Sequence, residues 1–155
     1  MWFVARSGVV SEQYVHDSLV YAVLVECERR IVTLFTAYPH WEPTELTDVV
    51  FTGVLAHHFR HVLEGNILDE IVAVEVNAFV GEHAGDFDRA SKWGWPPDYT
   101  AADAFRESLR VGGFQPYEIS SSYGMSGWVI ARSLRYLPRS ARYRGPQDGG
   151  TRGEG

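Results

Sequence analysis

Residues 18–38 read SLVYAVLVECERRIVTLFTAY, and this stretch decides the fold class. Its two arms, residues 18–27 and 31–38, are rich in β-branched and aromatic side chains, which favour strands. The polar triplet 28–30 separates the arms. The pattern therefore predicts an antiparallel β-hairpin, and the apolar residues on both faces of its first arm favour a strand that is covered on both sides.

A second hairpin is predicted near the other end of the chain. Residues 114–121 and 128–137 form two strand-like runs around a turn that contains Gly124 and Gly127. Because proline cannot donate a ladder hydrogen bond, Pro116 limits the first run to a sheet edge or to the start of its strand.

Between the hairpins the hydrophobic pattern changes several times. Residues 46–53 are predicted to form a strand, and residues 54–63 fit either a strand or a short helical turn. Residues 70–76 are assigned to a strand by their β-branched content, although the apolar spacing from Val72 to Val80 also fits a helix. Residues 81–97 contain three Gly and two Pro and are predicted to be an irregular connection.

The clearest helix covers residues 101–111. Thr100 is expected to cap its start together with Asp103, and the glycine pair 112–113 is expected to end it. This helix is predicted to be the main one of the domain and to pack against the sheet.

These elements predict a single α+β domain over residues 1–137. Its core is a mostly antiparallel sheet of about five to seven strands, with one main helix near residues 100–111. Residues 138–155 are polar and rich in Gly and Arg, so they are expected to form a disordered tail that cannot repay its ordering entropy.

The formal net charge of −6 is unevenly placed. Residues 1–136 carry 10 basic and 18 acidic side chains, which gives this part a charge of −8. Such a surface repels phosphate backbones, so no nucleic-acid partner is expected. No run approaches the ~20 apolar residues that cross a bilayer, and no signal-peptide pattern is present, so the expectation is a cytoplasmic protein without a membrane partner.

The histidine cluster 57–61 is the strongest candidate for metal ligation. His57 and His61 would point the same way on a helix or on a strand, and Asp69 could serve as a third ligand. The glutamate of the helical metalloprotease motif is missing, however, and the single Cys27 allows neither a multi-cysteine zinc site nor an intrachain disulfide. We therefore expect no metal and no cofactor, and a small metal-dependent or hydrolytic enzyme using His57, His61 and Asp69 is the alternative function.

Aromatic residues flanked by prolines form the candidate binding surface. Trp93, Trp95 and Tyr99 could make a rigid contact surface, because Trp and Tyr are common interface anchors. The favoured alternative is that the loop folds these rings over the sheet. Together with His57 and His61, these three residues are the candidate binding residues, and none is assigned a catalytic role.

Three other polar segments lack the spacing of known sites. His16 and Asp17 are adjacent and would point in opposite directions on an extended chain, so they form a dyad only at a turn. The acids at positions 82, 86 and 88 lack the glycine and terminal glutamate of a calcium loop. The segment 124–127 reads GMSG and is not a Gly-x-Ser-x-Gly nucleophile elbow.

Blocks of the sequence resemble recurring blocks of small uncharacterised bacterial proteins. They are HDSLV (16–20), VVFTGVLAHHF (49–59) followed by GNILDEI (65–71), and YEISSSYGMSGWVIA (117–131). Some proteins with a comparable His-Asp block resemble immunity proteins of bacterial toxin systems. The resemblance implies an α+β binding protein that masks a toxin and has no catalytic residues to transfer.

The predicted function is therefore that of a non-enzymatic binding protein, with an immunity-like role as its more specific form. The acidic body suits a basic protein partner such as a nuclease toxin, because complementary potentials favour association. A second copy of the chain is the other partner considered, with the aromatic loop or a sheet edge pairing with itself.

Overall fold

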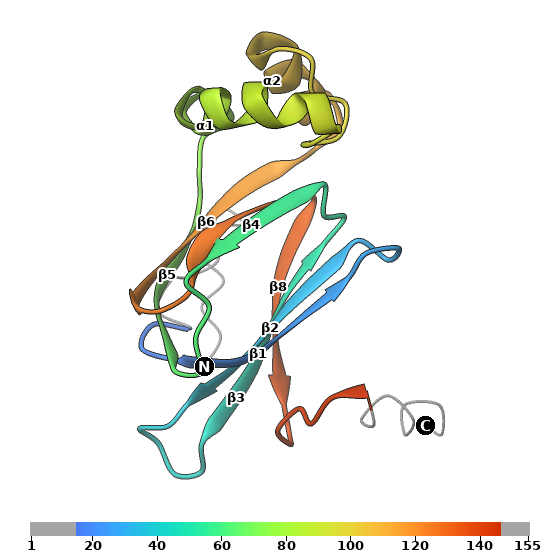
Figure 1. Ribbon diagram of the computed structural model, residues 1–155. Coiled ribbons are helices and arrows are strands. Elements are labelled where there is room, and N and C mark those ends of the chain that lie inside the picture. Colours follow the sequence, from blue (N-terminus) through green and yellow to red (C-terminus); the bar gives the residue numbers. More distant parts are fainter. Residues whose placement is uncertain (1–14, 147–155) are drawn as a thin grey trace.

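The predicted hairpins lie in one antiparallel sheet in the computed structural model, which describes residues 15–146 (Figure 1). β1 (Leu19–Glu26) pairs with β2 (Ile31–Tyr38), as the opening stretch predicts. Eight strands are described, in the order β4-β7-β6-β5-β1-β2-β3-β8, so the α+β class is confirmed and the sheet is larger than predicted. The remaining strands are β3 (Glu45–Thr52), β4 (Ala56–Arg60), β5 (Asn66–Ala73), β6 (Gln115–Tyr123), β7 (Ser126–Ala131) and β8 (Ser133–Arg139).

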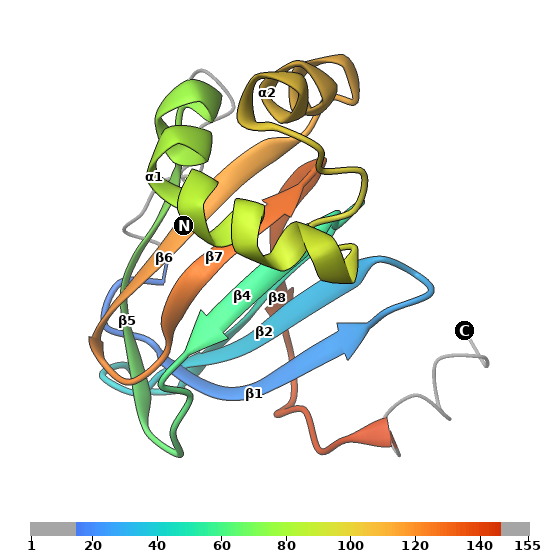
Figure 2. The ribbon, with the colours of Figure 1, turned by 45° about the horizontal axis from the view of Figure 1, so that its top comes forward.

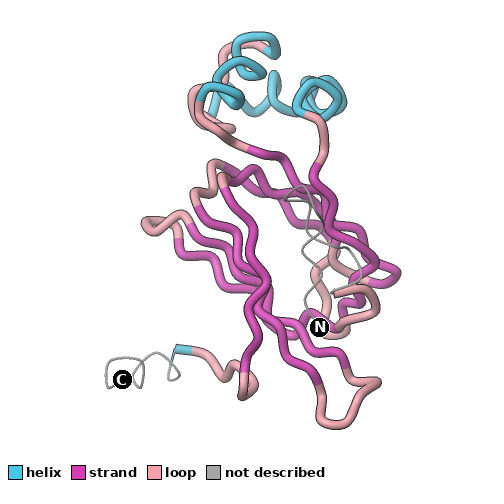
Figure 3. Tube along the Cα trace, turned by 180° about the vertical axis from the view of Figure 1, so that it is seen from behind, coloured by secondary structure: helices cyan, strands magenta, loops and turns pink. Residues whose placement is uncertain are grey.

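The sheet bends into two four-stranded halves whose inner faces share one core (Figure 3). We call β1, β2, β3 and β8 the first half-sheet, and β5, β6, β7 and β4 the second half-sheet. The chain crosses between them where β3 leads into β4 and β7 into β8, and there Leu55 N donates to Ile130 O at 2.8 Å. At the other junction β1 meets β5 through only two residue pairs, beginning with Leu19↔Ile67.

The larger hydrophobic core lies between the two half-sheets. Each half-sheet alternates apolar residues toward this core and other residues outward, as the two-residue period of a strand requires. The first half-sheet contributes Val20, Val32, Leu34, Val49, Phe51 and Tyr136, and the second contributes Leu68, Ile71, Ile119, Met125, Val129 and Ala131.

Helices cover part of the outer face of the second half-sheet (Figure 2). They are α1 (Val76–Ala90), the 3-10 turn η2 (Ser91–Trp93) and α2 (Ala102–Val111). Strand β7 joins the two cores, because Trp128 packs in the helical core whereas the next residue, Val129, packs between the half-sheets. The helical core contains Ala56, Phe79, Val80, Phe87, Tyr99, Phe105, Leu109, Trp128 and Ile130.

Helix α1 corrects the prediction of an irregular connection over residues 81–97. It is also longer than α2, so the predicted helix is not the main one. The strand assigned to residues 70–76 begins earlier and ends at Ala73, and Glu75 then caps α1 by accepting hydrogen bonds from two backbone N–H groups. The glycines at 81 and 85 weaken the intrinsic helix preference, but burial of the apolar face against the sheet overrides that preference.

The predicted second hairpin and the helix predicted over residues 101–111 are confirmed with changes in detail. β6 and β7 pair antiparallel, and Arg132 separates β7 from β8 within the predicted second arm. Pro116 stands second in the interior strand β6, which matches the strand-start option. The cap of α2 was predicted wrongly, because Ala101 occupies that position without a side-chain hydrogen bond, whereas Gly112 ends the helix as expected.

The segment after residue 137 is partly ordered, which corrects the predicted start of the disordered tail. β8 extends to Arg139. The ring of Tyr143 then stacks on Phe35, with centroids 3.9 Å apart and an angle of 1°. Residues 147–155, the rest of the predicted tail, lie outside the described residues, as do residues 1–14 of the predicted domain. In the part of the chain between these ends, no helix combines the length and apolar character needed to cross a membrane.

Candidate functional site

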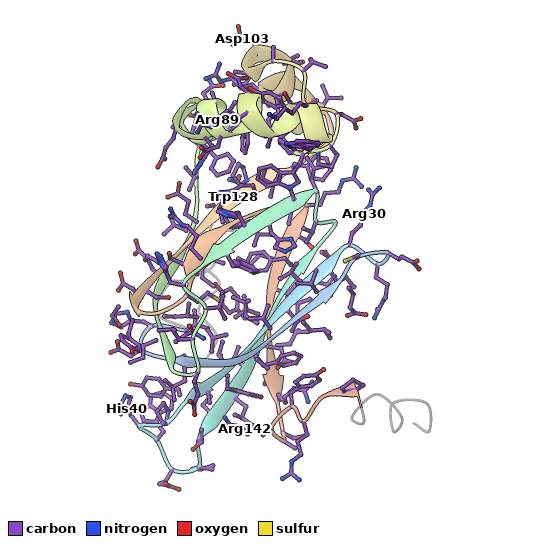
Figure 4. The ribbon with its side chains drawn as sticks, in the orientation of Figure 1. Arg30, His40, Arg89, Asp103, Trp128 and Arg142 are labelled. Atoms are coloured by element: carbon purple, nitrogen blue, oxygen red, sulfur yellow. The ribbon has the colours of Figure 1, made fainter. Side chains whose placement is uncertain are left out.

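The open part of the second half-sheet's outer face forms a groove beside α1. Trp128 lies between α1 and the sheet (Figure 4) and marks the limit of the helical core. Beyond it the floor becomes polar, because the outward positions of four neighbouring strands carry hydrophilic side chains. The strand pairs Arg60↔Ser126, Val72↔Glu118 and Glu70↔Ser120 define this floor.

Two adjoining cavities make up this helix-side groove. Both are lined by Arg60, His83 and Trp128. The larger cavity, about 550 Å³, extends under the end of α1 toward His58, Asp86 and Trp95. The smaller cavity, about 260 Å³, extends over β5 and β6 and is lined by Glu70, Glu82, Glu118, Ser120 and Ser126.

His83 stands at the boundary between the two cavities, and aromatic rings fix its orientation. Its ring centroid lies 4.6 Å from that of Phe79, 5.8 Å from Trp128 and 5.9 Å from Phe87. The ligand atoms of Glu82, His83 and Glu118 lie within 4.8 Å of one another. The groove therefore presents an oriented imidazole between two carboxylates.

His16 extends the charged surface from the groove toward the start of β1. Its Nε2 lies 3.5 Å from Asp17 Oδ2, and its Nδ1 lies 3.4 Å from Asp69 Oδ1 and 2.9 Å from the Asp69 backbone oxygen. The turn anticipated for a His-Asp contact is present, with Asp17 at φ 60°. The hydrogen bond to the Asp69 carbonyl, reinforced by the charge of Asp17, raises the pKa of His16.

A continuous row of carboxylates results. Ser120 Oγ donates to Asp69 Oδ2 at 3.4 Å and so connects the His16 end to the smaller cavity. The side chains at 16, 17 and 69 are each about half exposed, so this end of the row faces solvent. We call this row the acidic strip; it consists of Asp17, Asp69, Glu70, Glu118, Glu82 and Asp86.

The aromatic residues chosen from the sequence divide into two groups. Trp93, on η2, is 80% exposed and shares a surface hollow with Asp86. Trp95 and Tyr99 instead fold onto the helical core, where both rings pack against Phe87. An exposed contact surface is therefore present at Trp93. Trp95 and Tyr99 instead follow the favoured alternative, in which the loop folds its rings inward.

Tyr99 has a structural role in this arrangement. Its hydroxyl donates to Asp88 Oδ1 at 2.6 Å. Burial, with this hydrogen bond, raises the pKa of Tyr99 to about 12. Tyr99 therefore stays protonated at neutral pH and ties its loop to the end of α1.

The structure does not bring His57, His61 and Asp69 together. His57 packs against Phe59, at 5.1 Å between ring centroids, and burial lowers its pKa, as does the neighbouring His58. His61 follows the end of β4 and is exposed. Asp69 lies on β5, which two other strands separate from β4, so the proposed enzyme site built from these residues has no geometric basis.

Sequence reasoning missed the group formed by Glu82, His83 and Glu118. Adjacent residues on a helix diverge by about 100°, so Glu82 and His83 do not have the spacing that predicts a pair of ligands. The third residue comes from β6, and only the packing of α1 on the second half-sheet brings it close. The chemistry of the three residue types was the only signal in the sequence.

Another cavity, of about 630 Å³, lies on the outer face of the first half-sheet, under the segment that contains Tyr143. Its charged lining is paired internally. Arg139 Nε lies 3.0 Å from both carboxylate oxygens of Asp48, and Arg29 pairs with Glu26 at 2.6 Å. The segment after β8 covers this face, because the Tyr143 ring stacks on Phe35 and the Tyr143 N–H donates to the Tyr21 hydroxyl at 3.0 Å. With its charges paired and its face covered, this cavity is a weaker candidate for a functional site than the helix-side groove.

Comparisons with protein-family models, with curated proteins and with solved structures found no match to this chain. Evidence for function therefore comes from the chemistry of the helix-side groove and the acidic strip.

Proposed function

We propose that this protein is a non-enzymatic, immunity-like binding protein whose acidic strip covers a basic surface of a partner protein. The observation that supports this proposal is the row of six carboxylates that runs along the helix-side groove and on to His16. Two guanidinium groups adjoin the row: Arg60 lines the groove, and Arg89 pairs with Asp86. A nuclease uses a basic surface to hold phosphates, so a protein that covers the partner's basic surface would block access of nucleic acid.

Charge and exposure favour a protein partner that carries clustered Lys and Arg. Each exposed carboxylate can accept a charge-assisted hydrogen bond from such a partner, and the summed negative potential steers the encounter. At the end of the strip Trp93 supplies an exposed aromatic anchor, in a hollow that it shares with Asp86 and with the cations Arg89 and Lys92. The strip therefore combines electrostatic attraction with one apolar contact.

The same charges disfavour self-association through this surface. Two copies meeting strip to strip would place like charges opposite each other, which costs free energy at an interface. The residues considered for an enzyme also lie on separate parts of the sheet. A binding protein with a foreign, basic partner is therefore favoured over a dimer and over an enzyme.

The test is affinity capture from the organism that encodes the chain, with two matched triple variants. The strip variant carries Asp17→Asn, Asp69→Asn and Glu118→Gln. The control variant removes three exposed carboxylates elsewhere, by Glu28→Gln, Glu42→Gln and Glu107→Gln.

The proposal predicts that the wild type and the control variant capture the same basic protein and that the strip variant loses it. Binding of the purified pair should weaken as salt is raised, and complex formation should suppress the partner's activity. Equal capture by the strip variant, or a captured partner without a basic surface, would contradict the proposal.

A further inference from the structure

We propose that Glu82, His83 and Glu118 form a binding site for one divalent transition-metal ion of the zinc class. The site joins α1 to β6 across the helix-side groove. Glu82 and Glu118 also belong to the acidic strip, so a bound dication would lower the negative charge of the strip. The inference nevertheless goes beyond the proposed partner binding, since it concerns a ligand of the isolated protein.

The geometry needs only a small adjustment to close around an ion. In a tetrahedral site with metal–ligand distances of about 2.0–2.2 Å, neighbouring ligand atoms lie about 3.3–3.6 Å apart. The three ligand atoms already lie within 4.8 Å of one another. Glu82 is exposed and can rotate inward, whereas His83 and Glu118 are half-buried and remain in place.

The donor set indicates the class of ion. One imidazole nitrogen with two carboxylate oxygens suits borderline cations such as Zn²⁺, Co²⁺ and Fe²⁺ better than Ca²⁺, which prefers six to eight oxygens. Three protein ligands leave a coordination position for water, and the adjoining smaller cavity of about 260 Å³ has room for it. The site therefore matches a three-ligand centre open to solvent.

Packing prepares the imidazole for ligation. The rings of Phe79 and Trp128 are in contact with each other, and both pack against His83, at 4.6 and 5.8 Å between centroids. Preorganised ligands lose less conformational entropy when the ion binds. This places the nitrogen donor on a rigid helix and leaves the most flexible ligand, Glu82, at the exposed side.

The electrostatics of the group also favour a cation. Two carboxylates and an imidazole lie close together, and within residues 15–146 no hydrogen bond or ion pair engages these three side chains. Arg60 lines the same cavities but makes no ion pair with a carboxylate in that part of the chain. A dication would replace the repulsion between Glu82 and Glu118 with attraction.

The test is calorimetric titration of the full chain with Zn²⁺ alone, in a buffer that does not chelate metals. The three ligand variants are Glu82→Gln, His83→Phe and Glu118→Gln, and the phenylalanine keeps a ring packed against Phe79 and Trp128. Two controls, Glu107→Gln on α2 and His40→Gln in the β2–β3 loop, remove an exposed carboxylate and an exposed imidazole outside the group. Circular dichroism verifies that each variant is folded.

The proposal predicts one Zn²⁺ per wild-type chain, unchanged affinity in both controls and a loss of at least about tenfold in each ligand variant. Co²⁺ should bind with the same stoichiometry, give a visible absorption band and alter the Trp fluorescence, because the site adjoins Trp128. Absence of saturable binding, or binding that all three ligand variants retain, would overturn the proposal. Since no partner is present, this outcome does not depend on the proposed function.

Discussion

Phe87→Ala is expected to destabilise the whole domain strongly, because Phe87 is the central ring of the helical core. Its side chain is 0% exposed. Its ring lies 5.5 Å from that of Phe105, 5.6 Å from Tyr99 and 5.8 Å from Trp128, measured between centroids. Removing a buried phenylalanine ring typically costs about 3–5 kcal/mol, which combines the lost burial with the cavity left behind.

This loss is large compared with the total stability of a domain, which is about 5–15 kcal/mol. It should appear as one cooperative transition, because β7 contributes Trp128 to the helical core and Val129 to the core between the half-sheets. Urea unfolding followed by both circular dichroism and Trp fluorescence measures the change, and the two signals should move to the same lower midpoint.

Trp93→Ala is the matched control. It removes an aromatic ring that is 80% exposed, so the free energy of unfolding should change by no more than about 0.5 kcal/mol. If Phe87→Ala cost no more than this control, the packing of α1 on the second half-sheet would be refuted. If the two signals separated, the coupling of the two cores through β7 would be refuted instead.

Three further predictions concern His16, Gly127 and Arg139. A backbone hydrogen bond raises the pKa of His16 above its ordinary 6.5. The contribution of His16 to the free energy of unfolding is therefore complete below pH 6.5 and is lost as pH rises through the folded-state pKa. An NMR titration that gives a pKa of 6.5 or less would contradict this. Gly127→Ala places a Cβ 1.9 Å from a backbone oxygen at φ +151° and should cost more than about 3 kcal/mol in urea unfolding, whereas Gly65→Ala, with open space around it, should be tolerated. Arg139→Ala leaves the 14%-exposed carboxylate of Asp48 without its guanidinium and should lower the free energy of unfolding by about 1–3 kcal/mol; an unchanged urea midpoint would show that this pair does not anchor β8.

The parts of the fold that were predicted correctly depend on local patterns. Two β-rich arms around a polar triplet give the β1–β2 hairpin, and a glycine-containing turn gives the β6–β7 hairpin. Helix α2 ends at Gly112 as its spacing indicates. In each case the elements are contiguous in sequence, so the residues themselves carry the signal.

The parts that were missed depend on contacts between distant segments. The apolar spacing from Val72 to Val80 fits a helix as well as a strand, and Gly81 and Gly85 lower the intrinsic helix preference of the residues that follow. The packing of α1 against Trp128 decides between these alternatives. Likewise, the order of the segment after β8 depends on Tyr143 stacking against Phe35, which lies far away in the sequence. Tertiary packing overrides intrinsic preference in both places.

The candidate site shows the same division. The exposure of Trp93 agrees with the interpretation that the aromatic loop offers a contact surface. The spacing within the histidine cluster 57–61 suggested metal ligation with Asp69, but two strands of the sheet separate the cluster from Asp69. The acidic strip combines residues of the turn before β1 with residues of β5, α1 and β6, so no single window of sequence contains it.

Site-specific photo-crosslinking tests the central claim most directly. A photoreactive phenylalanine analogue at Ser120 lies in the middle of the acidic strip, and the same analogue at Thr44 lies in the β2–β3 loop, at the end of the molecule away from the helices (Figure 1). In cells of the organism that encodes the chain, irradiation should join position 120, and not position 44, to a basic protein. Crosslinking to that protein from position 44 alone, or equally from both positions, would show that the strip is not the binding surface.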